Sequence, residues 1–218
     1  METTTNTTVL TMPRIGDMAP DFEAITTTGK IKFSEFNKDK WVILFSHPAD
    51  FTPVCTTELS EFARQQDYFT SQNTKLIGLS IDSIHSHMAW VHNVKEKLGV
   101  LMNFPIIADI DMHVAKLYGM LQPGESQTAA VRAVFFIDPT GKIRLIMYYP
   151  LNVGRNMDEI KRVLLALQTS DANKCAMPLN WKQGDKVIVP PPTTVEAMTE
   201  REKSNYEMVD FYLAKREL

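Results

Sequence analysis

Uninterrupted apolar runs alternate along this chain with segments whose apolar residues recur at helical spacing. Three runs, residues 41–45, 76–81 and 134–137, contain almost no polar side chains, as expected for strands that are covered on both faces of a sheet. The third run leads into residues 138–141 (DPTG), a strong turn sequence. Residues 142–149 are therefore predicted to be its hairpin partner.

Helical patterns lie between and after these strands. Apolar residues three or four positions apart predict helices in three places, and Gly99 closes the second of them. The three patterns are carried by Leu59, Phe62, Ala63 and Phe69; by Met88, Val91, Val94 and Leu98; and by Met157, Ile160, Val163, Leu164 and Leu167. Strands separated by helices of this length indicate an α/β fold with a mainly parallel sheet and helices on both faces.

Both ends of the chain differ from this pattern. Residues 1–12 contain six threonines and little that could be buried, so we expect a flexible leader. The domain predicted over residues 13–169 is followed by a polar, turn-rich segment and by three prolines at 190–192. Residues 193–196 offer a capping box that opens a charged helical stretch towards the end. Residues 170–218 are therefore predicted to form a smaller C-terminal domain or arm.

Composition and charge argue against several classes of partner and site. The 23 basic and 26 acidic residues give a net charge of −3 without blocks of one sign, which predicts neither nucleic acid nor an anionic membrane as a partner. The apolar runs are too short to span a bilayer, and the first residues lack the pattern of a secretory signal. Two distant cysteines form no disulfide scaffold, no CxxC motif and no metal spacing. We therefore expect a cytoplasmic protein with reduced thiols and no bound metal or cofactor.

Cys55 has the most informative surroundings. It follows the first buried run by a short loop, and a helix with explicit start signals is predicted to begin just before it: Thr52 suits the N-cap and Pro53 the first helical position. Cys55 then occupies the third helical position, where unpaired N–H groups and the helix dipole favour a thiolate. The alternative is a small buried hydrophobic residue, the usual fate of a free cysteine.

A nearby cation would strengthen the case for a thiolate, and two arginines stand out. Arg132 lies within an apolar stretch, where a guanidinium usually needs an anionic partner. Arg155 follows Gly154 in a predicted loop and could equally be an ordinary solvated arginine. The spacing alone does not establish that either arginine reaches Cys55.

These residues resemble a known family. Pro48, Thr52 and Cys55 form the PxxxTxxC motif of the peroxiredoxins, and residues 47–58 (HPADFTPVCTTE) strongly resemble the 1-Cys subgroup. Further matching positions are Asp82-Ser83, residues 104–109, Arg132, Tyr149-Pro150, Gly154-Arg155 and residues 178–185. The resemblance implies a thioredoxin-like fold with a small C-terminal extension domain. It also implies an antioxidant thiol peroxidase that reduces hydrogen peroxide and organic hydroperoxides to water and alcohols.

The resemblance also implies a role for each residue. Cys55 is the peroxidatic cysteine, which becomes a sulfenic acid, while Thr52 hydrogen-bonds the peroxide and Arg132 stabilises the thiolate and polarises the O–O bond. Catalysis of this kind needs donors fixed around two adjacent oxygens in a site that excludes bulk water. The supporting residues are Glu58, which holds the arginines, Arg155 as the second arginine, and His47 and Pro48 as lining of the pocket.

Cys175 leaves two catalytic cycles open. A 1-Cys enzyme needs no second cysteine, whereas 2-Cys relatives place a resolving cysteine just before a Trp-Lys-Pro-Gly-like segment. Cys175 precedes residues 181–184 (WKQG) at a slightly longer spacing, and its polar, turn-rich surroundings predict an exposed, mobile thiol. Cys175 is therefore a candidate resolving residue, and the partner subunit of a dimer would be its natural acceptor.

Partners and rival functions follow from the same resemblance. An external thiol such as thioredoxin or glutathione is expected as reductant, together with a homodimer that in this family can assemble into a decamer. A chaperone or structural assembly is the competing class, and a disulfide oxidoreductase would suit the fold but not a chain without CxxC. His85, His87 and His92 do not converge at metal-binding spacing, so they are expected to be solvated histidines on a helix.

Overall fold

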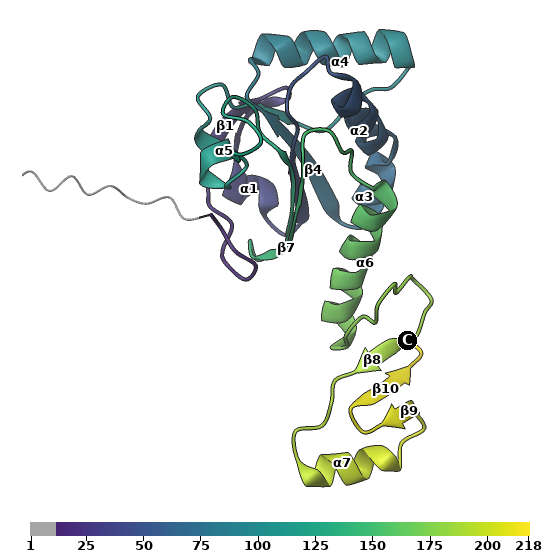
Figure 1. The fold of residues 1–218 in the computed structure, drawn as a ribbon. Coiled ribbons are helices and arrows are strands. Elements are labelled where there is room, and N and C mark those ends of the chain that lie inside the picture. The colour runs from purple at the N-terminus through teal and green to yellow at the C-terminus, as the bar shows by residue number, and fades with distance from the viewer. Residues whose placement is uncertain (1–11) are drawn as a thin grey trace, which may run out of the picture. The chain divides into compact units, whose positions relative to one another are not determined.

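The computed structural model describes residues 12–218, and the chain divides into two compact units at Arg155/Asn156 (Figure 1). The expected leader, residues 1–12, lies outside the described residues except for Met12. The division falls earlier than the predicted boundary at 169/170. The helix that spans this region packs Leu165 and Ala166 against apolar residues of the C-terminal unit, which explains the earlier division.

One sheet organises the first unit. Its strands, in chain order, are β1 (Glu23–Thr26), β2 (Gly29–Lys32), β3 (Trp41–Ser46), β4 (Thr74–Ser80), β5 (Ile106–Ala108), β6 (Arg132–Ile137) and β7 (Ile143–Tyr149). They form a seven-stranded sheet in the order β2-β1-β5-β4-β3-β6-β7. The three predicted runs lie in β3, β4 and β6, and the predicted hairpin partner is β7, so these predictions are confirmed.

The expectation of a mainly parallel sheet is wrong. Only the pairs β3/β4 and β4/β5 are parallel, while β1/β2, β1/β5, β3/β6 and β6/β7 are antiparallel. Two hairpins, β1/β2 and β6/β7, account for two of the antiparallel pairs, because a short turn can join only antiparallel neighbours. The β1/β2 hairpin was missed, since its four-residue strands alternate weakly in polarity and lie at the edge of the sheet.

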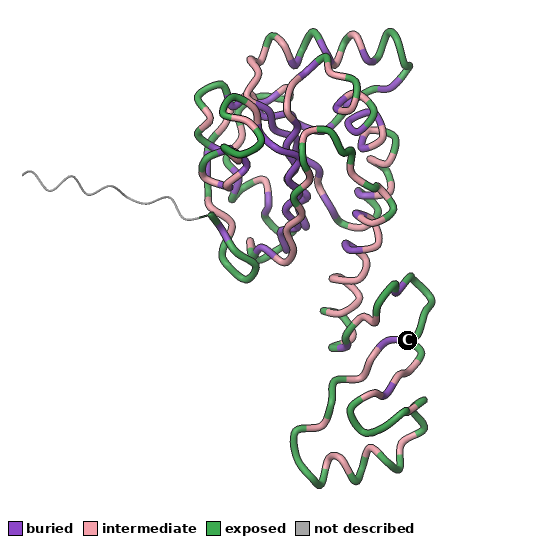
Figure 2. The backbone as a smooth tube through the Cα atoms, viewed as in Figure 1, coloured by how far each residue is buried: buried purple, intermediate pink, exposed green. Residues whose placement is uncertain are grey.

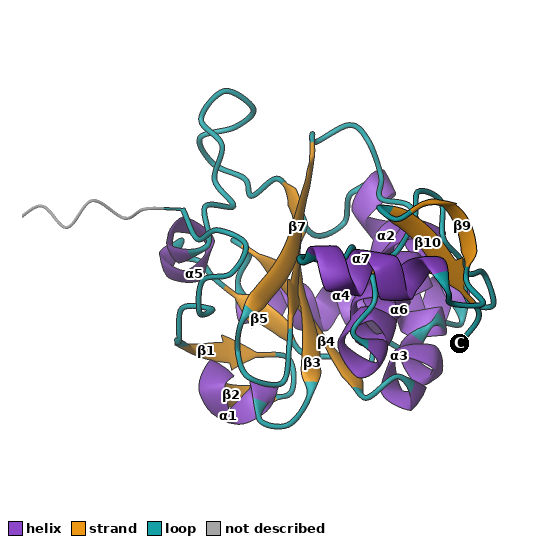
Figure 3. Ribbon diagram, turned by 90° about the horizontal axis from the view of Figure 1, so that it is seen from below, coloured by secondary structure: helices purple, strands orange, loops and turns teal. Residues whose placement is uncertain are grey.

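Helices cover the sheet on both faces. They are α1 (Phe33–Asn37), α2 (Pro53–Arg64), α3 (Gln66–Ser71), α4 (Ile84–Leu98) and α5 (His113–Leu117). Figures 1 and 3 show α1 and α5 on one side of the sheet, and α2, α3 and α4 on the other. The first predicted helix is interrupted at Gln65, so that α2 and α3 follow each other. Gly99 ends α4 in the left-handed conformation, as predicted.

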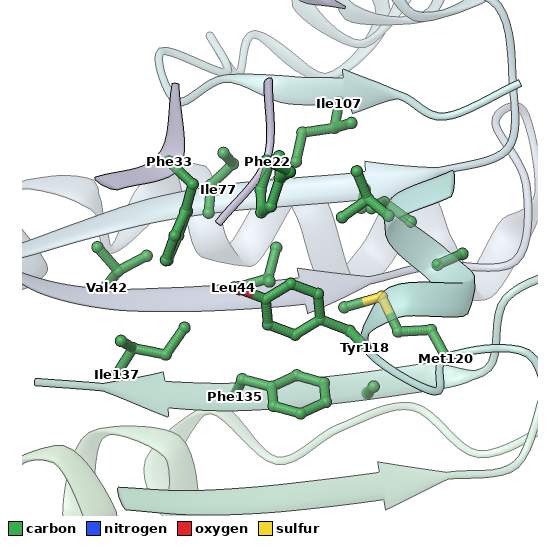
Figure 4. Packing of buried hydrophobic residues seen from close by; sticks show 14 of the residues in the cluster. Phe22, Phe33, Val42, Leu44, Ile77, Ile107, Tyr118, Met120, Phe135 and Ile137 are labelled. Carbon is green, nitrogen blue, oxygen red and sulfur yellow. The ribbon is translucent and has the colours of Figure 1, made fainter. Parts of the chain in front are cut away.

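Successive side chains of β3 point to opposite faces of the sheet, and both faces are packed. Val42 and Leu44 belong to the core that α1 and α5 cover, where Tyr118 meets Phe135 edge to face (Figure 4). On the opposite face Phe45 stacks on Phe62 of α2, with ring centroids 4.0 Å apart. Figure 2 shows that the buried residues run through the centre of the sheet. The carboxyl end of β3 is thereby fixed from both sides.

The second unit holds a long helix and a small sheet. Its elements are α6 (Met157–Asn173), β8 (Val187–Val189), α7 (Val195–Glu202), β9 (Glu207–Asp210) and β10 (Leu213–Arg216). The predicted cap is present, because the Thr194 side chain accepts a hydrogen bond from the Ala197 N–H. The helix expected to continue towards the end of the chain stops at Glu202, however. The last strands instead pair in the antiparallel order β8-β10-β9.

No helix among the residues that the structure describes is long and apolar enough to cross a membrane.

Replacing Ile137 by alanine tests the packing of the first unit. Ile137 is fully buried at the end of β6, so we expect Ile137→Ala to lower the free energy of unfolding by about 2–5 kcal/mol in urea titrations. Ile110→Ala is the matched control, since Ile110 is 68% exposed and its truncation leaves no cavity. Equal effects of the two substitutions would contradict the assignment of the core.

Candidate active site

Cys55 lies at the start of α2, directly after the loop that follows β3. Thr52 has extended backbone angles at the N-cap, and Pro53 is the first helical residue, as predicted. Cys55 is therefore the third residue of the helix and is completely buried. The first N–H groups of a helix have no intrahelical partner, so those of this turn are available to an anion.

The Thr52 hydroxyl has a different partner from a usual capping residue. It donates a hydrogen bond of 2.8 Å to the carbonyl oxygen of Ala49, and it makes no side-chain cap. Its proton is therefore used within the loop, while the lone pairs of Oγ1 remain free to accept. In this arrangement Oγ1 can accept a hydrogen bond from a ligand hydroxyl, and the expected hydrogen bond of Thr52 to the peroxide stays a prediction.

Arg132 reaches Cys55 across the sheet. It begins β6, which lies between the edge strand β7 and β3, and its guanidinium is almost fully buried. Nη1 lies 3.3 Å from the Cys55 Sγ and 2.7 Å from Oε2 of Glu58. Nε and Nη2 both donate to the carbonyl oxygen of Leu151, which fixes the plane of the guanidinium.

Arg155 completes the polar network around Glu58. Its Nε and Nη2 donate to the two carboxylate oxygens at 2.9 and 2.7 Å, and its backbone N–H donates to Oε1. Nη1 donates to the carbonyls of Ser46 and Ala133, and the guanidinium lies over the rings of Phe45 and Phe62. Arg155 is therefore a buried member of the cluster and not a solvated loop residue.

The charges of this cluster do not balance. One carboxylate, Glu58, faces two guanidinium groups, and all three side chains are less than 5% exposed. Burial raises the pKa of Glu58, but the charge and hydrogen bonds of Arg155, together with the charge of Arg132, outweigh it and hold the pKa below the ordinary 4.5. One positive charge is left over beside Sγ of Cys55, where it favours a thiolate.

His47 and Pro48 extend the site along the loop. Pro48 is half-buried, whereas His47 is fully buried and bonds through Nε2 to Asp50 at 3.0 Å. The second oxygen of Asp50 bonds Nδ1 of His87 at 2.8 Å. These three residues are the one group of buried potential metal ligands found in the described part of the chain, with donor atoms within 4.8 Å of one another.

The expectation that His87 is solvated is wrong. His87 is completely buried in the first turns of α4, on the same face as Trp90 and Val94, while Met88 of the predicted apolar pattern is 56% exposed. His92 is exposed, as expected. The spacing of His87 to Trp90 and Val94 (i, i+3, i+7) was a usable signal, and it was missed because histidine was counted as polar.

Cys175 does not have the surroundings that its neighbouring sequence suggested. It is buried, with 6% exposure, and packs with Trp181 and Val187 in the core of the second unit. The turn that follows α6 folds back, and Ala176 pairs with Ile188 as an isolated bridge, which covers the thiol. The expected exposure of Cys175 is therefore wrong, and its resolving role stays a prediction.

Comparisons with known proteins agree on a family. Residues 15–146 match the model of the AhpC/TSA family, and residues 166–205 match the C-terminal domain of 1-Cys peroxiredoxin. A peroxiredoxin of Methanosarcina mazei is 55% identical over 93% of this chain and 96% of its own length.

Solved structures give the same result. A yeast mitochondrial 1-Cys peroxiredoxin superposes with a TM-score of 0.85 at 42% identity, covering 95% of this chain and all of that one. A mutant of peroxiredoxin 6 from Arenicola marina superposes with a TM-score of 0.85 at 38% identity, covering 94% and 98%. The chain belongs to the peroxiredoxin family. It is thus a thiol-dependent peroxidase with a thioredoxin-like fold and a C-terminal extension, as the sequence resemblance implied. Peroxiredoxins act on a peroxide with a thiol as reductant.

Glu58→Gln tests the charge network through its dependence on pH. The folded-state pKa of Glu58 lies below 4.5, so its carboxylate stabilises the fold above about pH 4.5, and this contribution is lost as the pH falls further. We expect Glu58→Gln to cost about 3–5 kcal/mol at pH 7, because two buried guanidinium groups lose their anion. The difference from the wild type should shrink in urea titrations below pH 4.5.

Glu61→Gln is the matched control for this measurement. Glu61 lies on the same helix, but its pair with Arg64 is exposed, and its substitution should change stability by less than about 1 kcal/mol. A Glu58→Gln penalty that stays constant down to acidic pH would show that the carboxylate does not act through its charge.

Proposed function

We propose that this peroxiredoxin reduces hydrogen peroxide and organic hydroperoxides at Cys55, which is oxidised to a sulfenic acid. The observation that carries the proposal is the Arg132 guanidinium, 3.3 Å from the Cys55 Sγ in a site with one surplus positive charge. A buried cation beside a thiol at a helix N-terminus favours the nucleophilic thiolate over the thiol.

In the oxidation step the thiolate attacks one peroxide oxygen. A sulfur–oxygen bond forms while the O–O bond breaks, and the electron pair of that bond leaves on the second oxygen. This oxygen departs as water or alcohol after it takes a proton, and Cys55 retains the first oxygen as S–OH. Negative charge builds on the leaving oxygen, so donors fixed near it lower the barrier.

The residues around Cys55 suit this distribution of charge. Nη1 of Arg132 is held between Glu58 and Cys55 and the other nitrogens by Leu151, so the positive charge of the guanidinium is fixed beside Sγ before the reaction. Thr52 can accept the peroxide O–H, since its own proton is given to Ala49. Arg155 and Glu58 are proposed as supports, because Glu58 holds Arg132, Arg155 holds Glu58, and neither bonds Cys55 in any contact of the described residues.

In the reduction step an external thiol attacks the sulfenic sulfur. Water leaves and a mixed disulfide forms, and a second thiol then releases Cys55 as a disulfide of the reductant forms. We propose thioredoxin or glutathione as donor. The yeast relative is described as resolved through glutathione and thioredoxin systems. The burial of Cys175 against Trp181 supports an external donor rather than an internal one.

We also propose a cytoplasmic homodimer, with assembly into a decamer as the larger form known in this family. Two unpaired cysteines support a reducing compartment. Sedimentation analysis of the reduced protein would distinguish a dimer from a decamer, and a monomer at all concentrations would contradict the proposal.

Cys55→Ser should abolish peroxide consumption, because serine is nearly isosteric with cysteine but a very poor nucleophile in this site. The measurement is stopped-flow peroxide consumption with a panel of thiol donors, and circular dichroism verifies the fold. A rate near that of the wild type would overturn the assignment of Cys55.

Cys175→Ser is the matched control and also decides the resolving step. We expect it to keep turnover with an external thiol. One equivalent of hydrogen peroxide should yield no cross-linked dimer on non-reducing gels of the wild type. A Cys55–Cys175 dimer that disappears in Cys175→Ser would instead establish a 2-Cys cycle.

Arg132→Met should slow both peroxide attack and alkylation of Cys55 at neutral pH. A charge-assisted hydrogen bond contributes about 1.5–3 kcal/mol, which corresponds to a loss of roughly ten- to hundredfold in rate. Iodoacetamide labelling across a pH series and stopped-flow kinetics measure the two effects. Arg64→Met, on the exposed side of the same helix that carries Cys55, is the control. Unchanged rates in Arg132→Met would assign the arginine to packing alone.

A further inference from the structure

A pocket of about 260 Å³ lies at the amino ends of the parallel strands β3 and β4. Its wall comes from the segments that lead into these strands, from α3 and from residues 103–105 before β5. The loop that carries Cys55 begins at the opposite end of β3, about 17 Å away along the six residues of the strand. The pocket is therefore separate from the site of the proposed peroxide chemistry.

Two lysines line this pocket, and no acidic residue is found among the described residues of its wall. Nζ of Lys75 donates to the carbonyl oxygen of Phe36 at 2.9 Å and lies 4.6 Å from the centroid of the Phe36 ring. Nζ of Lys40 donates to Oδ1 of Asn73. Both ammonium groups thus have neutral partners, and each keeps further N–H donors for a ligand.

The two positive charges also act on each other. Burial lowers the pKa of Lys75, and the charge of Lys40 lowers it further. The described wall offers no anion that would offset these effects, so positive potential is concentrated in the pocket. A ligand that carries negative charge would relieve the repulsion between the two ammonium groups.

Both ammonium groups are held in place by the chain itself. Lys75 is fixed by its two contacts with Phe36. Asn73 accepts from Lys40 through Oδ1 and donates through Nδ2 to the carbonyl oxygen of Asp39. Groups that are fixed in advance lose little entropy when a ligand binds, which favours affinity.

The rest of the wall supplies an apolar surface and an unused acceptor. Leu76 and Phe104 line the pocket and are themselves buried, so part of the wall is apolar. Gln66 donates through Nε2 to Thr70, whereas its Oε1 is buried without a hydrogen-bond partner among the described residues. Buried acceptors usually find a donor, which a ligand hydroxyl would provide. An apolar wall with a few convergent polar groups is typical of small-molecule sites.

We propose that this pocket binds a small phosphate monoester, with the phosphate between the ammonium groups of Lys40 and Lys75 and the organic part against Leu76 and Phe104. Two ammonium groups match a phosphate monoester, whose charge is about −1.5 to −2 at pH 7. Lysine binds phosphate as a point charge. The inference does not depend on the proposed function, because no residue of the pocket belongs to the peroxide site.

Titration of the full chain with phenyl phosphate, followed in 1H–15N NMR spectra, tests the proposal. We expect amide shifts that are confined to residues 36–41, 66–76 and 103–105. Phenyl phosphate should bind at least about fivefold more tightly than inorganic phosphate, because its ring adds apolar contact. It should also bind more tightly than benzoate, which carries a single charge, and phenol should cause no shifts.

Three results of this titration would overturn the proposal. One is the absence of shifts at a phenyl phosphate concentration of about 10 mM. Another is an equal affinity for inorganic phosphate or for benzoate. The third is a set of shifts centred on residues 46–58, which would place the ligand at the Cys55 loop instead.

Lys75→Met and Lys40→Met should each weaken phenyl phosphate binding about ten- to hundredfold, through loss of a charge-assisted hydrogen bond. Lys38→Met is the matched control, since Lys38 is exposed, lies two residues from Lys40 and does not line the pocket. It should change the affinity less than about twofold, because salt screens exposed charges. A loss in Lys38→Met equal to that in Lys75→Met would assign the binding to net charge alone and contradict a defined site.

Asn73→Asp is a second variant, and it keeps both lysines. The introduced carboxylate would face Nζ of Lys40, where Oδ1 of Asn73 lies in the wild type, and would compete with the phosphate. The left-handed backbone at this position, with a φ of 53°, suits aspartate as well as asparagine. We expect phenyl phosphate binding to weaken at least about tenfold. Unchanged binding in this variant would show that the phosphate does not lie beside Lys40. These titrations need no peroxide, so they judge the pocket even if the proposed function is lost.

Discussion

The carboxylate of Glu58 is the interaction on which the site depends, because it is the one anion that two buried guanidinium groups share. Removing charges from water is costly unless they are paired and hydrogen-bonded. Glu58 satisfies this requirement only in part, since it leaves one positive charge without a permanent anion. Sγ of Cys55 lies 3.3 Å from Nη1 of Arg132, where a thiolate would supply that anion. The imbalance that makes the cluster expensive to bury would thus favour the reactive form of the cysteine.

The fold must bring three distant segments together to build this imbalance. Glu58 and Cys55 share α2, Arg132 comes from β6, and Arg155 follows the last strand of the sheet by a short loop. The antiparallel pairing of β3 with β6 puts Arg132 beside the carboxyl end of β3. Stacking of Phe45 on Phe62 holds α2 against that strand, and Arg155 lies over both rings. Packing and electrostatics therefore position the same atoms.

The elements that the sequence predicted correctly are those whose signal is local. Continuous apolar runs indicated β3, β4 and β6, and the N-cap and proline at Thr52 and Pro53 placed the start of α2. The direction of strand pairing was missed, because it depends on which segments meet and not on any one segment's pattern. The burial of His87 was missed for a related reason: Asp50 and Ile107, both distant in the sequence, supply the hydrogen-bond partners that make a buried imidazole tolerable at that position. Residue types identified Cys55 and Arg132 as candidates. The short distance between the two side chains could not be predicted, because it depends on the pairing of β3 with β6.

The two cysteines demonstrate why burial alone does not determine reactivity. Both are free and both are buried, at 0% and 6% exposure. Sγ of Cys55 faces a guanidinium donor at a helix N-terminus, where the charged form of sulfur is stabilised. Sγ of Cys175 faces the carbonyl oxygen of Thr169 at 3.9 Å, beside Trp181 and Val187. A carbonyl can only accept, so this neighbour offers sulfur no donor or positive charge. Equal burial thus accompanies two different environments, and the partners of each sulfur make the difference.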